Sequence, residues 1–588
     1  MEPRRVVLAV ILMALVLIAA PMLFPTAKPI AQDSAVAADS IRADSVRRAT
    51  AASSSGVSTA APSTAATSAG VAAPAAAAAT PGTARADTSG RAGDSTAAAS
   101  AATAAATVDT TAITTPRAVF RTTNSGAALI GAEFPGFRAL RDRGRVKGEA
   151  VELANTGERL LSFRLVVPGD TIRLDRQTFA TSRVDEGGRA TVAYTATVKS
   201  LPVSIVYSFL PDSYRVNVAA SVVGAPSNSF LLVDLPRGFR SSEADTAEDQ
   251  SHLAYAFKPE KAGAEGITFR SLDPGERQIE AGPISWVVTK SKYFLLGVLT
   301  PVGKPGFVEL DVTGGVRTAK VATRAEATAI LPLSSGEASF DVYAGPQEFK
   351  RLVAMGREFE TSNPYGGWLQ GVVQPFATFV IKLLLWMKAS LGVSYGWILV
   401  LFGITVRIVL WPLNQRAMRS SMQMQRIQPE LQAIQAKHKG DPQKLQAEMM
   451  KMYKEHGMSP FSSLSGCLPM LIPLPIFFAL FFVFQNTIEF RGVSFMWMPD
   501  ISIKDPLYVL PVLVAITAML LSYIGMKGMK SNDQQKMMMY MMPAMMLFIF
   551  LNMASGLNLY YLVQNLASLP QQWLIAHERS KQMPLVRG

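Results

Sequence analysis

Residues 393–413, VSYGWILVLFGITVRIVLWPL, are long and apolar enough to cross a bilayer, yet they carry a full charge at Arg407. The hydrocarbon core of a membrane is about 30 Å thick and takes about 20 apolar helical residues. An ionisable side chain inside such a span costs at least about 2.5 kcal/mol, and arginine cannot lose its proton to avoid that cost. Arg407 therefore needs a counter-ion, water or a route to the surface.

The composition is that of a membrane protein with soluble parts attached. The chain has 588 residues, of which 49% are hydrophobic and only 17% charged, against about a quarter in average soluble domains. The net charge of +13 comes mostly from short segments between apolar stretches, so we expect no specific nucleic-acid partner. A single cysteine, Cys467, excludes intramolecular disulfides and a cysteine-based metal cage. We expect no metal, no other cofactor and no catalytic residues.

The first 116 residues divide into an apolar segment and a tether. Residues 1–25 place two arginines before an apolar run of about twenty residues, which is either a cleavable secretory signal or a retained transmembrane anchor. The length of the run favours the anchor. Residues 26–116 are dominated by Ala, Ser, Thr, Gly and Pro, with almost no aromatic residues to bury, and they are predicted to form a disordered tether.

Residues 117–356 consist of short β-branched runs, such as VSIVYSFL (203–210) and YRVNVAASVV (214–223), separated by Gly, Pro and Asp. Their period-two alternation indicates an exported all-β sandwich. A sugar-processing enzyme is the alternative interpretation. It is disfavoured because the region has one histidine, His252, and no motif that pairs its scattered acids. We expect a binding or scaffolding domain.

Residues 365–391 are predicted to form an amphipathic helix on the membrane surface, because Lys382 and Lys388 leave one face of an otherwise apolar helix. An additional span is the alternative. Residues 392–413 are the second span.

Residues 414–460 follow the second span and carry eight Lys/Arg and four Asp/Glu. Their apolar residues keep helical spacing, with a break at Lys439-Gly440-Asp441-Pro442, where Gly440 ends one helix and Asp441 caps the next. This pattern predicts a basic, amphipathic helical hairpin.

The rest of the chain is predicted to complete a helical bundle. Its segments are a third span at 462–485, a short exported loop at 486–505, spans at 506–526, 536–552 and 556–576, and a short tail at 577–588. Basic residues gather at the N-terminus, in the hairpin, before the fifth span and in the tail, so both termini are predicted to be cytoplasmic. The fold prediction is a multi-domain membrane protein: an all-α polytopic bundle of six spans with an exported all-β sandwich domain.

Arg407 has no partner of opposite charge within the predicted spans, because spans three to six contain no Asp or Glu. One interpretation is that it reaches out to the lipid headgroups. The sharper interpretation combines it with polar residues that recur at helical spacing in the last span. These are Tyr561, Gln564, Asn565, Ser568 and Gln572. Together they predict a hydrated concavity that receives a negative charge, either from an anionic solute, as in a transporter or channel, or from an acidic residue of another polypeptide.

Five motifs of the chain resemble the YidC membrane protein insertases. They are ITVRIVLWPL (404–413), the hairpin with IQPELQAIQ (427–435), SGCLPMLIPLPIFFALFFV (465–483), DPLYVLPVL (505–513) and SGLNLYYLVQNLASLPQQWLI (555–575). AGPQEFKRL (344–352) resembles the end of the family's exported β-domain, which is periplasmic in bacteria. The resemblance covers everything except the tether.

The resemblance implies a mechanism without bond-making chemistry. It implies a five-helix core around a hydrophilic groove open to the cytoplasm and the lipid of the bacterial inner membrane. Arg407 would attract acidic residues in the exported tail of a nascent membrane protein, and Tyr560 and Tyr561 match family positions at the groove. The hairpin would receive substrate from the ribosome or the signal-recognition pathway, with the Sec translocon as a further partner. The expected contact residues are Met418, Arg419, Met422, Arg426, Lys437, Lys439, Met449 and Met452.

Overall fold

A computed structural model describes residues 108–582 except 142–144, 316, 318–321, 365–369, 439, 456–473 and 527–532. The predicted anchor at 1–25, most of the tether, the first part of the third span with Cys467, and the end of the tail lie outside the described residues.

Strands form most of the structure up to residue 346. They are β1 (Thr110–Thr114), β2 (Val119–Thr123), β3 (Ala128–Arg141), β4 (Arg145–Glu152), β5 (Ser162–Val167), β6 (Asp170–Arg173), β7 (Ala180–Glu186), β8 (Arg189–Val198), β9 (Leu201–Phe209), β10 (Arg215–Val222), β11 (Phe230–Asp234), β12 (Ala254–Pro259), β13 (Glu265–Thr268), β14 (Arg277–Lys290), β15 (Phe294–Leu299), β16 (Phe307–Gly314), β17 (Ala325–Pro332) and β18 (Glu337–Pro346). The helices of this region and its C-terminal border are short: α3 (Thr246–Ser251), α4 (Phe349–Met355) and the 3-10 turns Leu174–Arg176, Phe269–Ser271 and Phe359–Ser362.

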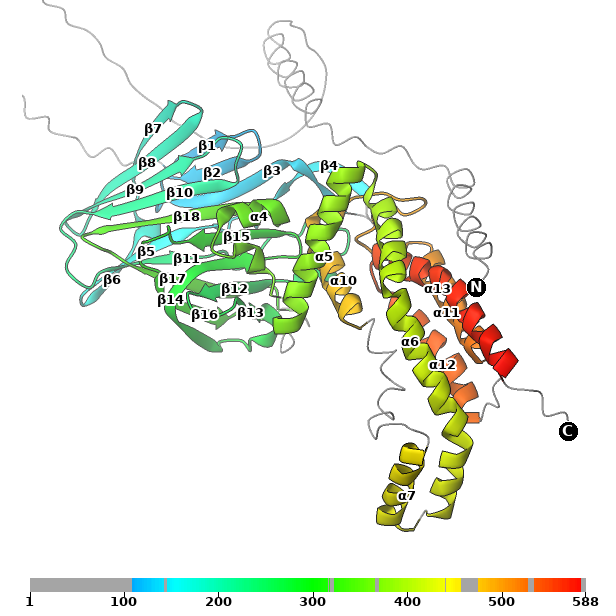
Figure 1. The fold of residues 1–588 in the computed structure, drawn as a ribbon. Helices are drawn as coiled ribbons and strands as arrows, with labels where there is room; N and C mark the ends of the chain where they lie inside the picture. Colours follow the sequence, from blue (N-terminus) through cyan, green and yellow to red (C-terminus); the bar gives the residue numbers. More distant parts are fainter. Residues whose placement is uncertain are drawn as a thin grey trace, which may run out of the picture. The chain divides into compact units, whose positions relative to one another are not determined.

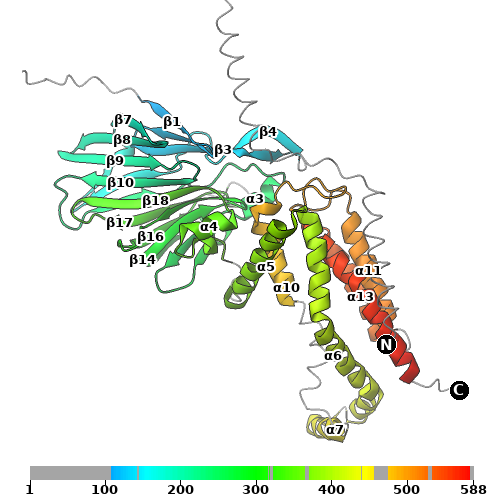
Figure 2. The ribbon, with the colours of Figure 1, turned by 45° about the horizontal axis from the view of Figure 1, so that its top comes forward.

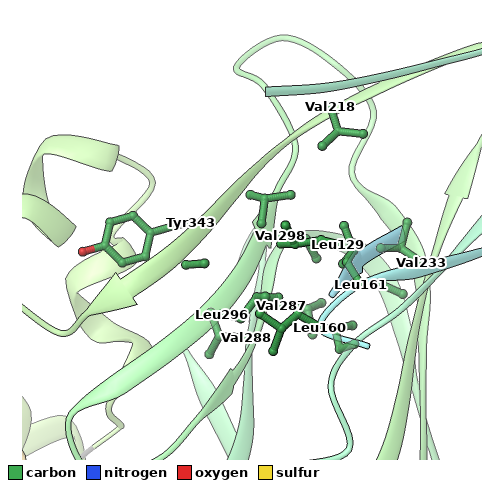
Figure 3. Packing of buried hydrophobic residues seen from close by; sticks show 14 of the residues in the cluster. Leu129, Leu160, Leu161, Val218, Val233, Val287, Val288, Leu296, Val298 and Tyr343 are labelled. Atoms are coloured by element: carbon green, nitrogen blue, oxygen red, sulfur yellow. The ribbon is translucent and has the colours of Figure 1, made fainter. Parts of the chain in front are cut away.

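The strands build two antiparallel sheets, which confirms the prediction of an all-β sandwich. The smaller sheet has the order β1-β2-β3-β4, and the larger runs β6-β5-β11-β17-β16-β14-β15-β18-β10-β9-β8-β7, with β12 and β13 attached at β14. Alternate residues of β9 and β10 are buried, as their period-two pattern predicts. Leu129 of the smaller sheet shares one apolar core with Val233 and Val298 of the larger one (Figure 3).

The sandwich begins earlier than predicted. Strand β1 lies within residues 110–114, inside the stretch 26–116 that we assigned to the tether. It pairs in register with β2, and Ile113 is buried in the core. The short sequence TTAIT resembles the preceding Thr/Ala-rich segment, and only its pairing with β2 distinguishes it.

The described helices after the β-domain are α5 (Gln370–Leu391), α6 (Tyr395–Lys437), α7 (Pro442–Glu455), α10 (Leu474–Asn486), α11 (Val509–Met526), α12 (Asp533–Phe550) and α13 (Ser555–Gln582), with a 3-10 turn at Ile488–Phe490. The boundary between the predicted second span and the predicted hairpin falls inside one helix. Helix α6 runs without a break through residues 413 and 414 and includes the first arm of the hairpin (Figure 1).

The turn of the hairpin is confirmed. Helix α6 ends at Lys437, and α7 begins at Pro442 after Asp441, whose Oδ1 accepts a hydrogen bond from the backbone N of Lys444 at 3.1 Å. The two arms share a small apolar core of Ile427, Met452 and Tyr453.

Helix α13 packs against both α11 and α6 (Figure 2). Two described helical segments, Tyr395–Gln415 of α6 and Val509–Met526, are long and apolar enough to cross a membrane. Helix α5 packs on α10 and buries Val380 and Leu384, while Phe379 and Trp386 on its other face remain exposed. The count of six spans and the membrane-surface position of α5 stay predictions.

The loop between α10 and α11 is bonded to the β-domain through Arg491. Its side chain is 4% exposed, its Nε lies 2.9 Å from both carboxylate oxygens of Glu243, and its Nη2 donates to the carbonyl of Arg138 at 3.0 Å. Glu489 of the same loop accepts a hydrogen bond from the backbone N of Phe349 at 3.1 Å, and burial raises its pKa to about 7. We call the contact formed by Arg138, Glu243 and Arg491 the junction.

Candidate functional site

The site is built where α6 and α13 approach each other closely at Gly403. A Cβ at this position would lie 3.0 Å from a methyl group of Val563, so glycine permits the approach. At the same level, Nε2 of Gln564 donates to the Gly403 carbonyl at 2.8 Å and to the hydroxyl of Tyr560 at 3.2 Å. An amide of α13 thus binds the backbone of α6 inside an apolar interface.

Arg407 lies one helical turn after Gly403 on α6, and it reaches the same face of α13. Its Nη2 donates to the side-chain oxygen of Gln571. The Nε2 of Gln571 donates in turn to the carbonyl of Trp411 at 3.3 Å, one turn further along α6. Gln571 is 1% exposed. A single neutral amide therefore bridges the guanidinium and the helix that carries it.

The guanidinium of Arg407 is incompletely satisfied. Its Nε is buried and makes no hydrogen bond to any residue that the structure describes. No ion pair joins Arg407 to a carboxylate within these residues, and α10, α11 and residues 537–582 of α12 and α13 contribute only one acid, Glu578. A guanidinium has five N–H donors and binds a carboxylate through two parallel hydrogen bonds. The arrangement can therefore attract and orient an anionic oxygen group.

Tyr560 and Tyr561 pack as aromatic rings among the helices. Tyr560 lies with its ring centroid 5.7 Å from that of Phe402 on α6, and Tyr561 lies 5.0 Å from Phe550 on α12 and 5.7 Å from Phe477 on α10. Tyr560 belongs to the Arg407 face through Gln564, whereas Tyr561 faces α10 and α12.

The predicted polar residues of the last span do not all meet Arg407. Asn565 donates to the carbonyl of Val514 at 3.2 Å and to the hydroxyl of Thr517 at 3.0 Å, both on α11. Ser568 donates to the Gln564 carbonyl within its own helix at 2.6 Å. The side-chain oxygen of Gln572 lies near Gly525 of α11. The prediction of one polar face that includes Arg407 is thus wrong for Asn565 and Gln572.

The reason is helical geometry. At about 100° per residue, positions 561, 565, 568 and 572 share one face, and positions 560, 564 and 571 share another about 90° away. Gln571 was not among the predicted site residues. It follows Gln564 by seven residues, about two helical turns, and this spacing alone places it on the same face of α13.

The hairpin residues expected to contact substrate are only partly described. The backbone of α6 includes Met418, Arg419, Met422 and Arg426, but the structure does not describe their side chains. Lys439 lies outside the described residues. Lys437 is exposed and Met449 is half-buried. Met452 is 2% exposed and packs between the two arms, so its side chain is not on the hairpin surface.

The opposite end of the bundle is closed by hydrogen bonds. Asp505 is fully buried and accepts from the backbone N of Leu507 at 3.0 Å and of Leu510 at 2.7 Å, which caps the start of α11. The backbone N of Ser555 donates to Ile503 at 2.7 Å, and that of Gly556 to Ile501 at 2.8 Å. These backbone hydrogen bonds hold the loop against the starts of α11 and α13, although Oγ1 of Thr487, Oε2 of Glu489 and Oδ2 of Asp500 are buried without a partner among the described residues.

Two family models match the chain: "YidC periplasmic domain" over residues 110–379 and "60Kd inner membrane protein" over residues 386–582. The membrane protein insertase YidC of Pelodictyon phaeoclathratiforme is 33% identical over 400 residues, 63% of this chain and 66% of that protein. Its counterpart in Chlorobaculum tepidum is 31% identical over 68% of this chain and 69% of its own. The chain thus spans about two thirds of the length of these relatives. A solved structure described as an active YidC insertase with its first transmembrane domain resolved is 19% identical, with a TM-score of 0.32 over 79% of this chain and 93% of that one.

Proposed function

Because the chain belongs to the family of YidC membrane protein insertases, we propose that it moves nascent membrane proteins into the bilayer and that Arg407 attracts acidic residues in their exported tails. Family membership favours this function over the alternative of an anion transporter. The observation that carries the role of Arg407 is its bonding: a half-buried, permanent charge on an apolar stretch of α6, whose hydrogen-bond partner among the described residues is a neutral amide.

In this proposal, electrostatic attraction recruits the substrate's tail and the hydrophobic effect drives insertion of its apolar span. In a partly desolvated site the attraction between a guanidinium and a carboxylate exceeds its value in water, so Arg407 brings the tail into the bundle. Burial of the substrate's apolar span in lipid then supplies the driving force, at about 25 cal/mol per Å² of apolar surface. Neither step needs a cofactor or a covalent intermediate, and we propose that the chain is not an enzyme.

The arrangement in the membrane follows from the same proposal. Six spans would place the β-domain in the periplasm and both termini in the cytoplasm, with α5 on the membrane surface. The exposed, basic hairpin arms, including Lys437, would face the cytoplasm and meet the nascent chain, the ribosome or the signal-recognition pathway, while the Sec translocon would be a lateral partner. The hydrogen-bonded loop that closes the other end of the bundle supports a site that opens toward the cytoplasm and the lipid.

Reconstitution in liposomes that contain no other protein tests the proposal. The substrate is a short single-span protein with an acidic exported tail, and insertion is measured by protease protection. We expect Arg407→Ala to lower insertion by about ten-fold, equivalent to about 1.4 kcal/mol, and Arg407→Lys to retain most of it because the charge remains. Unchanged insertion by Arg407→Ala, with a substrate that needs this protein, would overturn the role of Arg407.

A further inference from the structure

The least expected contact of Arg407 is its bond to Gln571, because the last span offers a neutral amide where an acid would bind a guanidinium more strongly. The guanidinium already makes a charge-assisted hydrogen bond to the amide oxygen, but a carboxylate would add an opposite charge and can bind a guanidinium through two parallel hydrogen bonds. Resting on the proposed function, we infer that Gln571 is a positioning residue that holds Arg407 while no substrate is bound and gives way to the carboxylate of the incoming tail.

Both polar atoms of the Gln571 amide are used, which fixes its orientation. The oxygen accepts from Arg407, and the nitrogen donates to the carbonyl of Trp411 at 3.3 Å. The reverse orientation would place the amide's N–H groups against the guanidinium and its oxygen against a carbonyl. Because Gln571 is 1% exposed, the amide holds the guanidinium on the α13 face of α6.

The contact between Arg407 and Gln571 is weak enough for a carboxylate to replace it. Nη2 of Arg407 donates to Gln571, but its Nε is buried and makes no hydrogen bond within the described residues. A tail carboxylate would add a second hydrogen bond and an opposite charge. A resident acid at position 571 would provide the same two gains permanently and would compete with every acidic substrate.

The neighbouring Gln572 provides a matched control. It lies one residue further along α13, is half-buried, and faces α11 near Gly525, so it belongs to the other face of the helix. A carboxylate introduced at position 572 adds the same charge to the same helix without reaching Arg407.

The experiment compares three full-length variants in the liposome assay: Gln571→Glu, Gln571→Leu and Gln572→Glu, together with Arg407→Ala. We expect Gln571→Glu to lower insertion of the acid-tailed substrate by about ten-fold, because an internal ion pair must be broken first. Gln571→Leu frees the guanidinium without neutralising it, and we expect a loss of less than about three-fold, or under 0.7 kcal/mol. Gln572→Glu should insert like the unmodified protein.

The order of the two Gln571 variants decides the inference. If Gln571 only braced α13 against α6, leucine would be the more damaging replacement, since glutamate still accepts a bond from Arg407. Insertion by Gln571→Leu equal to or below that by Gln571→Glu would therefore overturn the inference. Because Arg407→Ala is measured in the same assay, loss of insertion in that variant with an intact Gln571→Glu would refute the inference alone. Intact insertion by Arg407→Ala would instead refute the proposed role of Arg407, on which the inference rests.

Discussion

Arg491 and Arg407 are both withdrawn from water, but they meet opposite kinds of partner. Arg491 binds both oxygens of Glu243 and a backbone carbonyl, and its guanidinium lies 5.6 Å from the ring centroid of Phe294. Arg407 is held by a neutral glutamine and leaves its Nε unsatisfied. The charge of Arg491 is neutralised within the described chain, whereas the charge of Arg407 is not.

The largest effect on stability is expected from breaking the ion pair between Arg491 and Glu243. Glu243→Gln leaves Arg491 buried without its counter-charge, and removal of one partner of a buried ion pair costs about 3–5 kcal/mol. We expect a loss of this size in the free energy of unfolding of the β-domain, measured by denaturant titration of the full-length protein. The exposed pair Arg173–Asp175 is the control, since its removal should cost less than about 1 kcal/mol.

The same titration on Arg407→Leu sharpens the comparison. Its removal strands only the neutral amide oxygen of Gln571, and a buried neutral group left without its hydrogen bond costs about 1–3 kcal/mol, so the loss of unfolding free energy should be smaller than the loss at Glu243. A loss at Arg407 as large as that at Glu243 would mean that both arginines serve the fold.

A smaller effect concerns the pH dependence of the β-domain next to the junction. Asp249 is buried near Glu243, and burial raises its pKa to about 6. The folded state therefore keeps a proton that the unfolded state releases at lower pH, so this group's contribution to stability falls as pH rises from about 4 to 6 and is constant above. The loss is at most about 1.4 kcal/mol per pH unit.

Asp249→Asn should remove this slope. The measurement is the difference in unfolding free energy between the unmodified protein and the variant across pH 4 to 7. That difference cancels the opposite contributions of carboxyls whose pKa is lowered, such as Asp175. A difference that does not change with pH would contradict the assignment.

The sequence predicts what depends on local periodicity. Alternating β-branched residues predict the sandwich, and the Gly440–Asp441 signal predicts the hairpin turn, because both are recorded in neighbouring residues. Strand β1 was missed because its pairing with β2 is not visible in a Thr/Ala-rich segment. The continuity of α6 across residues 413 and 414 is not recorded in the composition, because the change from apolar to basic residues marks the end of the apolar span and not the end of a helix.

The site was predicted in part for the same reason. Arg407 is evident from its composition alone, since a lone charge in an apolar span is costly wherever the helix points. The partner of Arg407 depends on the rotation of α13 about its own axis, which is set by packing on α6 and α11. The sequence does not record that rotation, so it cannot tell whether the stripe with Asn565 and Gln572 or the stripe with Gln564 and Gln571 faces Arg407. The Arg491–Glu243 pair joins residues 248 positions apart, so no local sequence pattern could predict it.

A double-mutant cycle between Arg407 and the substrate's tail tests the central claim most directly. Insertion is measured with acidic and neutralised tails, each with the unmodified protein and with Arg407→Gln. If the guanidinium meets the tail carboxylate, neutralising the tail should lower insertion by about ten-fold with Arg407 present and by less than about two-fold without it, a coupling of about 1 kcal/mol. Equal losses in both proteins would show that the tail charge acts elsewhere and would contradict the account.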